Sequence, residues 1–212
     1  MGVKLKNRVK SFDVILIKTQ KGRLKMDDKL IICLAGMPGS GKSIIVEVAK
    51  ECGYDIVVMG DVIREEAERR RLEPNPENLG KIMLELRRSE GRAVIAKRCI
   101  PKIEKTAKFK VVVDGIRSLS EVEKFKESFP KFSFIAVHAS PETRFRRVYR
   151  RRRSDDPETW EIFHERDMRE LSVGLGNAIA MAEHIIVNEG EMEALKEKVR
   201  EILRRIEEKW MT

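Results

Sequence analysis

The chain has few of the residues on which many protein sites depend. Among its 212 residues are three cysteines, Cys33, Cys52 and Cys99, and three histidines, all widely spaced. An odd number of scattered cysteines favours neither a disulfide framework nor a zinc site, and it fits a reducing compartment. Ordinary structural roles are expected for the histidines. The sequence therefore argues against a disulfide-stabilised or zinc-binding protein.

Long apolar runs are also missing. No stretch approaches the roughly 20 apolar residues that cross a bilayer, and the N-terminus has no apolar signal segment followed by small residues. These two absences predict a soluble, cytoplasmic protein with no membrane partner.

The first 25 residues differ from the rest of the chain. They are rich in lysine, hold one short apolar run at 14–17, and are followed directly by Met26. We expect residues 1–25 to form an N-terminal extension without a catalytic role, with Met26 as an alternative start of the chain. An added strand, or a basic tail that contacts nucleic acid, is the competing interpretation.

The remaining residues, 26–212, have the length and composition of one compact α/β domain. The whole chain is 42% hydrophobic and 37% charged, and its 44 lysines and arginines against 35 aspartates and glutamates give a formal net charge of +9. Such a charge suits anionic ligands, whether nucleotides, phosphorylated metabolites or nucleic acid. Charge alone does not choose among them.

One segment matches a phosphate-binding pattern in full. Residues 36–43 spell G-M-P-G-S-G-K-S, the G-x-x-x-x-G-K-[ST] motif, and the apolar run at 30–35 supplies the strand that must precede it. Glycines let the backbone turn its N–H groups toward a phosphate chain, and the following helix presents its positive end. The segment therefore predicts a nucleoside triphosphate site. Its expected cofactor-binding residues are Gly36, Met37, Pro38, Gly39, Ser40, Gly41, Lys42 and Ser43.

Two residues of this loop have predicted chemical roles. Lys42 is expected to meet the β- and γ-phosphates as a catalytic residue, and the Ser43 hydroxyl is expected to hold Mg²⁺. Apolar residues at helical spacing continue over 44–51, which predicts the helix that follows such a loop.

Beyond the loop, apolar runs alternate with helical patterns, which is typical of βαβ units and a parallel sheet. Strands are predicted at 30–35, 55–59, 110–114, 132–137 and 184–187. The predicted fold class is α/β, a P-loop NTPase with three αβα layers around a five-stranded parallel sheet. A helical acceptor-binding insertion is expected at about 62–108, broken at 74–76 and at Gly91. A short lid is expected at about 144–172, and an amphipathic helix from Met192 onward.

The segment at 59–64, M-G-D-V-I-R, joins a predicted strand to a predicted helix. Asp61 is expected to cap this helix, and it could also bind or deprotonate an acceptor hydroxyl as a catalytic residue. Arg64, one turn later, could grip an acceptor phosphate. A simple cap and a surface arginine are the alternatives.

The apolar strand at 111–113 ends in Asp114, as a Walker B strand does. Asp114 is expected to organise Mg²⁺ beside Ser43 and to lie in the substrate site. Gly115 allows close backbone approach, and Arg117 brings a second cation into the same cleft for substrate binding and catalysis. A plain turn with a surface arginine is the alternative.

Arginines crowd the predicted lid. They are Arg144, Arg146, Arg147, Arg150, Arg151, Arg152 and Arg153, with Arg166 and Arg169 further on. Arginines on a closing lid stabilise the charge of a transferring phosphoryl group and exclude water. Helical spacing must turn several of them to solvent, so the run also fits a solvated or nucleic-acid-binding helix. Asp155 and Asp156, before Pro157, are expected to begin the next helix.

Taken together, these segments resemble the P-loop nucleoside monophosphate kinase group, which includes adenylate kinases and dephospho-coenzyme A kinases. Residues 60–64 resemble the adenylate kinase Gly-Asp-x-(Leu/Ile)-Arg element that contacts the acceptor phosphate. Residues 114–117 resemble its Asp-Gly-aromatic-Pro-Arg element, with one residue fewer and no proline. Residues 153–156 resemble the Arg-x-Asp-Asp of the lid, although Arg166 lies about a turn further on than the family spacing.

From residue 26 to residue 212 the chain looks most like a family of archaeal P-loop proteins described as dephospho-coenzyme A kinase-like. For that family the resemblance implies ATP binding and does not settle the acceptor. It also implies that the loop at 187–190 lies near the adenine.

The predicted reaction is in-line transfer of the ATP γ-phosphoryl group to a small, phosphorylated acceptor of the nucleoside monophosphate or dephospho-coenzyme A type. Lys42 and Mg²⁺ would neutralise charge, Arg64 and Arg117 would hold the acceptor, and Arg153 would close on the transition state. The competing hypothesis is an NTP-hydrolysing regulatory protein that switches its contact with RNA, ribosomes or another protein. The net charge and the arginine run favour that hypothesis, whereas the Arg64 and Arg117 segments favour the kinase.

Overall fold

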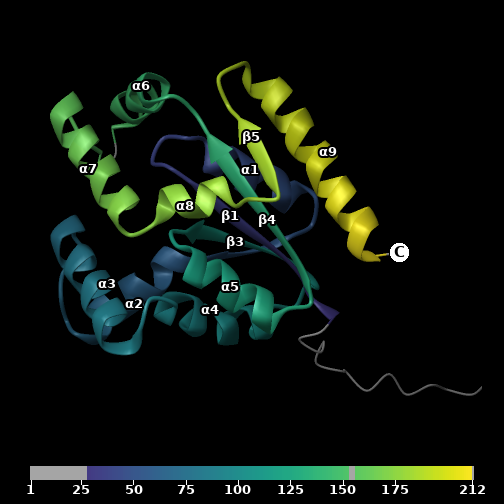
Figure 1. Ribbon diagram of the computed structural model, residues 1–212, viewed down its shortest axis with the longest axis horizontal. Helices are drawn as coiled ribbons and strands as arrows, with labels where there is room; N and C mark the ends of the chain where they lie inside the picture. The colour runs from purple at the N-terminus through teal and green to yellow at the C-terminus, as the bar shows by residue number, and fades with distance from the viewer. Residues whose placement is uncertain (1–27, 153–155, 212) are drawn as a thin grey trace, which may run out of the picture.

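A computed structural model describes residues 28–152 and 156–211 and contains a five-stranded parallel sheet between two layers of helices (Figure 1). The strands are β1 (Leu30–Gly36), β2 (Asp55–Val58), β3 (Lys110–Ile116), β4 (Lys131–His138) and β5 (His184–Val187). Their order across the sheet is β2-β3-β1-β4-β5. The predicted fold class is confirmed, and each predicted strand end lies within two residues of the observed one.

Burial explains why the central strands read as unbroken apolar runs. All seven residues of β1 are buried, because β1 lies between β3 and β4 and is covered by helices on both faces. Strands buried on both faces cannot alternate apolar with polar side chains. The edge strand β5 differs, since Ile186 is buried while its neighbours Ile185 and Val187 are about half exposed.

The two faces of the sheet carry separate cores. One core is formed with α1 (Lys42–Glu51) and α9 (Met192–Met211), which lie side by side on one face. The other face packs against five helices (Figure 1). These are α2 (Met59–Arg69), α3 (Pro76–Glu90), α4 (Val94–Lys105), α5 (Leu119–Ser128) and α8 (Leu175–Ala180). This arrangement is the predicted three-layer architecture.

The helical segment predicted between the second and third strands is divided where the sequence indicates. Before α3, the side chain of Asn75 accepts a hydrogen bond of 2.9 Å from the backbone N–H of Asn78, and Pro76 occupies the first helical position. Proline suits that position because its missing N–H would have no helical partner there. At the other end, Gly91 stops α3 with a φ of 93°, a left-handed conformation that glycine adopts without strain.

Two predicted helix starts are wrong. Helix α2 begins at Met59, directly after β2, and its N-cap is Val58, so Asp61 lies inside the first turn and caps nothing. The strand runs into the helix without the intervening turn that a capping aspartate requires. Helix α7 (Trp160–Ser172) is capped by Thr159, whose hydroxyl accepts from the N–H of Ile162, and not by Asp156. Asp155 lies outside the described residues.

Helices α6 (Pro141–Arg151) and α7 form most of the predicted lid. Helix α6 follows the carboxyl end of β4, with Ser140 as its cap and Pro141 as its first residue. In residues 28–152 and 156–211, no helix is long and apolar enough to cross a membrane.

Candidate active site

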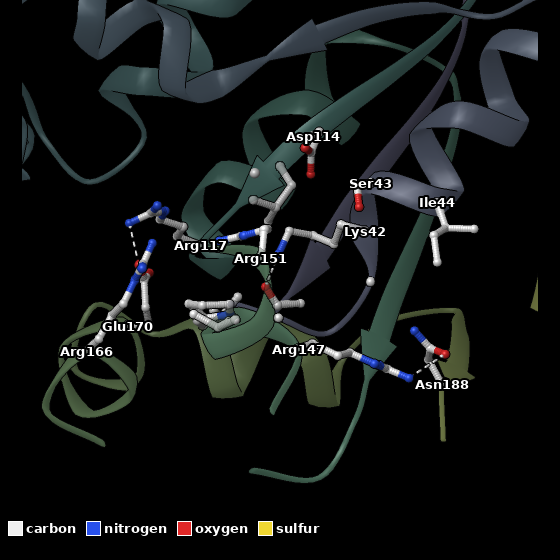
Figure 2. A pocket seen from close by; sticks show the side chains of 18 of the residues that line it. Lys42, Ser43, Ile44, Asp114, Arg117, Arg147, Arg151, Arg166, Glu170 and Asn188 are labelled. Carbon is white, nitrogen blue, oxygen red and sulfur yellow. Dashed lines mark hydrogen bonds and ion pairs between the residues drawn. The ribbon is translucent and has the colours of Figure 1, made fainter. Parts of the chain in front are cut away.

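A cavity of about 560 Å³ opens at the carboxyl ends of β1 and β3 (Figure 2). Its wall includes the loop between β1 and α1, the end of β3, one side of α6 and α7, and the loop after β5. Ligands of open α/β sheets bind at this edge, outside the carboxyl ends of the strands. The structure therefore brings the predicted phosphate loop, Asp114 and Arg117 into one site.

The phosphate-binding loop, residues 36–43, is held in a conformation that demands glycine. Gly39 and Gly41 have φ values of 80° and 101°, in the left-handed region. A Cβ at Gly39 would lie 2.7 Å from the carbonyl oxygen of Arg144, and one at Gly41 would collide with Asn188. Both positions need glycine for conformation and for space.

The Lys42 ammonium group is folded back onto its own loop. Its Nζ donates hydrogen bonds to the carbonyl oxygens of Gly36, at 2.6 Å, and Met37, at 3.3 Å. Burial lowers the pKa of Lys42 from its ordinary value, and the nearby Asp114 carboxylate partly opposes that effect. The lysine is thus positioned at the centre of the loop, where a triphosphate would lie.

Asn188, in the loop after β5, connects the phosphate loop to the end of β4 through hydrogen bonds. Its side-chain Nδ2 donates a hydrogen bond of 2.8 Å to the carbonyl oxygen of Ser40, and its Oδ1 accepts one of 3.2 Å from Arg147. Its backbone N–H donates to the carbonyl oxygen of His138 at the end of β4. Asn188 is only 4% exposed, so this contact is sheltered from water.

Asp114 owes its orientation to a bulge in β3. The pairing with β1 runs in register as far as Leu34 and Asp114, and then Ala35 pairs with Ile116, so Gly115 is an extra residue. Gly115 has a φ of 106°. Bulges of this kind turn neighbouring side chains and recur beside active sites. Here the bulge follows directly on Asp114, which lines the cavity.

Asp114 and Ser43 fit a magnesium site. Burial raises the pKa of Asp114, opposed by Lys42 and Arg117, and its Oδ1 atom is buried with no hydrogen-bond partner among the described residues. Mg²⁺ prefers oxygen ligands and is held by one or two protein groups together with substrate phosphates. In the described part of the chain, no cluster of three or more histidine, cysteine, aspartate or glutamate side chains could hold a metal by itself.

Arg117 is held from two sides. Its Nη1 lies 2.8 Å from Oε1 of Glu170 on α7, and its backbone N–H donates to Oε2 of the fully buried Glu121 at 2.8 Å. The other oxygen of Glu121 accepts from Arg87 at 2.6 Å. The turn that follows β3 is therefore fixed by a buried ion pair between α3 and α5.

Arg144, the first arginine of the run, is buried and structural. Its guanidinium donates to both oxygens of Asp167 on α7, at 2.8 and 2.5 Å, and to the carbonyl oxygens of Ala139 and Pro38 at 3.1 and 3.2 Å. It also lies over the ring of Phe163, 5.0 Å from the centroid. Arg144 thus ties the phosphate loop to α6 and α7.

The other arginines divide by helical spacing. Arg147 and Arg151 face the cavity together with Arg166 from α7. Arg151 and Arg166 also form ion pairs with Asp156. The predicted catalytic Arg153 lies outside the described residues.

Asp61 and Arg64 lie apart from this cavity wall. They pair with each other at 2.6 Å, one turn apart on α2, and both side chains are about half exposed. Their helix starts beside the bulge of β3, since a Cβ at Gly115 would lie 3.6 Å from the Cβ of Met59. The predicted acceptor roles of Asp61 and Arg64 stay predictions.

Polar atoms without partners gather at the site. Of six buried side-chain atoms that have no hydrogen-bond partner in the described part of the chain, four belong to the loop or the cavity wall. They are Ser40 Oγ, Asp114 Oδ1, Arg147 Nη1 and Glu170 Oε2. An unpartnered buried polar atom costs about 1–3 kcal/mol, so such a cluster indicates a place that a polar ligand completes.

Several residues of this site could not be predicted from the sequence. Glu121, Asp167 and Glu170 occur at helical positions among many surface charges, where only the fold reveals burial. Asn188 was expected near the adenine, and no local pattern linked it to the phosphate loop. For Arg144, helical spacing of three and seven positions from the cavity-facing Arg147 and Arg151 was the one available signal.

The fold and the phosphate-loop motif define the chain as a protein of the P-loop kinase-like fold. A model of the AAA domain matches residues 35–164, which include the phosphate loop, Asp114 and most of the lid. The chain belongs to the UPF0200 family. A UPF0200 protein of Hyperthermus butylicus is 48% identical over 178 residues, which cover 84% of this chain and 95% of that protein.

Solved kinases share the fold at low sequence identity. A shikimate kinase from Bacteroides thetaiotaomicron superposes with a TM-score of 0.55 at 15% identity, covering 82% of this chain and 98% of that one. A gluconokinase from Sinorhizobium meliloti gives a TM-score of 0.54 at 18% identity, covering 87% and 97%. Identities this low establish a common fold only.

Proposed function

We propose that the chain is an ATP-dependent kinase that transfers the γ-phosphoryl group to a small acceptor. The observation that carries the proposal is the cluster of unpartnered buried atoms around a complete phosphate loop. Unpaired donors such as Arg147 Nη1 match phosphate oxygens, and the unpaired carboxylate oxygen of Asp114 matches a cation. The kinase fold of the structural neighbours supports the same conclusion.

Several cavity residues have a proposed part in this reaction. The backbone N–H groups of the phosphate loop and Lys42 hold the triphosphate, while Asn188 keeps the loop in shape. Ser43 and Asp114 would hold Mg²⁺, which when bound neutralises charge on the phosphates. The bond between the γ-phosphorus and the β-phosphate oxygen breaks as the acceptor oxygen attaches in line, so that ADP leaves and any proton carried by the acceptor oxygen is released.

The two ends of the cavity suit the two substrates. The end with Asn188, Gly190 and Met192 is proposed to receive the adenosine, in agreement with the loop named by the family resemblance. The end with Arg117, Arg166 and Glu170 is proposed to receive the acceptor. Closure of α6 and α7 over both would exclude water and limit hydrolysis.

Nucleotide binding is the first test. Titration calorimetry with ATP and Mg²⁺ should show a single site in the wild type and at least about a tenfold weaker one in Lys42→Ala. Lys50→Ala is the matched control, because Lys50 is an exposed lysine on the same helix. Equal binding by wild type and Lys42→Ala would overturn the proposal.

Turnover is the second test. ADP production should rise when one member of a panel of nucleosides, nucleoside monophosphates, dephospho-coenzyme A and phosphorylated metabolites is added. The same slow production with every compound would contradict the kinase.

A regulatory NTPase that contacts RNA is the second candidate. One observation favours it, since Arg146 and Arg150 are exposed on α6, Arg152 is exposed at its C-terminal end, and none of the three pairs with a carboxylate in the described residues. Replacing these three by glutamine should then weaken RNA binding and reduce its salt dependence. Unchanged RNA binding in that variant would remove this candidate.

A further inference from the structure

The acceptor end of the cavity carries a carboxylate beside its arginines. Arg117 faces Glu170 at 2.8 Å, and Arg166 lies 3.9 Å from Asp156 (Figure 2 shows Arg117, Arg166 and Glu170). Asp156 also pairs with Arg151, so among the described residues Glu170 is the carboxylate that belongs to Arg117 alone. The rest of the wall is different, because Lys42 and Arg147 lie where the triphosphate is proposed to bind.

Building on the proposed kinase function, we propose that this end receives a hydroxyl group, with the Glu170 carboxylate as its hydrogen-bond acceptor. The acceptor substrate is therefore a small alcohol at the point of transfer, and a phosphate group is excluded as the receiving group. A phosphate elsewhere in the acceptor molecule is compatible with this assignment.

The hydrogen bonds of Glu170 indicate that the ligand atom beside it is a hydrogen-bond donor. Glu170 lines the cavity and is 9% exposed, and one of its oxygens is occupied by Arg117 while Oε2 has no partner in the described part of the chain. An ionised carboxylate only accepts hydrogen bonds, so its unmet requirement is for a donor. A hydroxyl group supplies one, whereas the dianion of a phosphate monoester has none to give.

Charge argues against a phosphate as the receiving group. A phosphate monoester carries about −1.5 to −2 charges at neutral pH. Such a group beside Glu170 would meet a like charge, and the nearby Arg117 guanidinium is already paired with that carboxylate. Juxtaposed like charges are a means by which binding sites reject the wrong partner.

The arrangement is fixed in advance of binding. The backbone of Arg117 is fixed because its N–H donates to Glu121, which is itself paired with Arg87, and its guanidinium is paired with Glu170. Glu170 lies one turn from Asp167, whose buried pair with Arg144 anchors α7. Groups held in this way recognise a ligand with little loss of conformational freedom.

The test removes the carboxylate without changing its shape. The protein is first saturated with Mg²⁺ and a non-hydrolysable ATP analogue, which fills the γ-phosphate position. Methyl phosphate, whose dianion carries no O–H donor, is then titrated by calorimetry into the wild type, Glu170→Gln and Glu165→Gln. Glu165 is an exposed residue of the same helix, so its variant removes an equal charge away from the cavity.

Glu170→Gln should bind methyl phosphate at least about tenfold more tightly than the wild type and Glu165→Gln, because it releases Arg117 and relieves the like charge. Equal methyl phosphate affinity in the wild type and Glu170→Gln would overturn the inference alone. Failure of the ATP analogue to bind would instead overturn the proposed function, and this inference with it.

If Glu170→Gln does not fold, a measurement on the wild-type protein tests the same inference. Matched pairs of an alcohol and its phosphate monoester, such as a nucleoside and its 5′-monophosphate, are offered with ATP and Mg²⁺. The new phosphate should appear on a hydroxyl oxygen. A product in which it is attached to the phosphate of the monoester would contradict the assignment.

Discussion

The side-chain amide of Asn188 donates a hydrogen bond of 2.8 Å to the carbonyl oxygen of Ser40, across 148 positions of sequence. This contact joins the loop after β5 to the middle of the phosphate loop. A second bond, from Arg147 to Asn188, connects the same amide to the lid helix α6. Asn188 thus links the phosphate loop, the sheet edge and the arginines of the cavity.

Asn188→Ala should weaken ATP binding by about tenfold, or about 1.4 kcal/mol, because the phosphate loop loses a buried hydrogen bond that fixes its shape. Calorimetric titration with ATP and Mg²⁺ measures the change. Asn78→Ala on α3 is the control, since the Asn78 amide bonds only to the nearby Glu73 carbonyl among the described residues. Equal ATP affinity for Asn188→Ala and wild type would refute this role.

Gly41→Ala should abolish ATP binding, whereas Gly53→Ala should preserve it. Both glycines have a left-handed φ, 101° and 86°, so both substitutions introduce conformational strain of about 1–2 kcal/mol. A Cβ at Gly41 would also collide with Asn188, while one at Gly53 meets nothing within 4 Å. Equal ATP binding by the two variants would show that the close contact between Gly41 and Asn188 does not affect nucleotide binding.

Asp167→Asn should lower the free energy of unfolding by about 3 kcal/mol, because it leaves the buried Arg144 guanidinium without its charged partner. Denaturant unfolding measures the loss. Arg146→Gln, on the exposed side of α6, should change the same quantity by less than about 0.5 kcal/mol. A loss of comparable size in both variants would show that the burial of the Arg144–Asp167 pair is unimportant.

Glu66 should make stability depend on pH in the acid range. Hydrogen bonds from Arg69, followed by those from Arg70 and Arg98 and opposed by burial, lower the pKa of Glu66 from 4.5 to about 2. A carboxyl whose pKa is lower in the folded state stabilises the fold above its unfolded pKa and loses that contribution as pH falls through the folded value. The affected window is therefore from about pH 4.5 down to about pH 2.

Replacing Glu66 by glutamine isolates the contribution of its charge to the free energy of unfolding. Glu66→Gln should be less stable than wild type by about 2 kcal/mol at pH 7, since charged hydrogen bonds are lost, and the difference should shrink toward zero near pH 2. Glu77→Gln, which removes an exposed pair with Lys81, should show no measurable difference at either pH. A wild-type advantage that stays constant from pH 7 to pH 2 would contradict the assignment to Glu66.

The fold was predictable because its signals are local and repeated. Five apolar runs, a complete phosphate motif, Pro76 and Gly91 each specify their element without reference to distant residues. The errors arose where tertiary structure decides. Asp61 has the chemistry of a cap, yet β2 passes directly into α2 and leaves it inside the helix.

The candidate site was predictable in its phosphate half. Lys42, Ser43, Asp114 and Arg117 follow from motif and strand position, and the structure brings them to one cavity. The acceptor half could not be predicted, because in the sequence Glu170 does not differ from the other acidic residues of a charged helix. Only the folded structure places it next to the end of β3. Its importance depends on burial and on its pairing with Arg117, which sequence spacing does not contain.

The most direct test of the account follows the label of γ-labelled ATP through a turnover with Mg²⁺ and the acceptor panel. The account predicts that the label moves from ATP to a hydroxyl oxygen of one acceptor, and that Lys42→Ala forms at least about a hundredfold less of this product. Recovery of all the label as inorganic phosphate, whichever acceptor is present, would contradict a kinase.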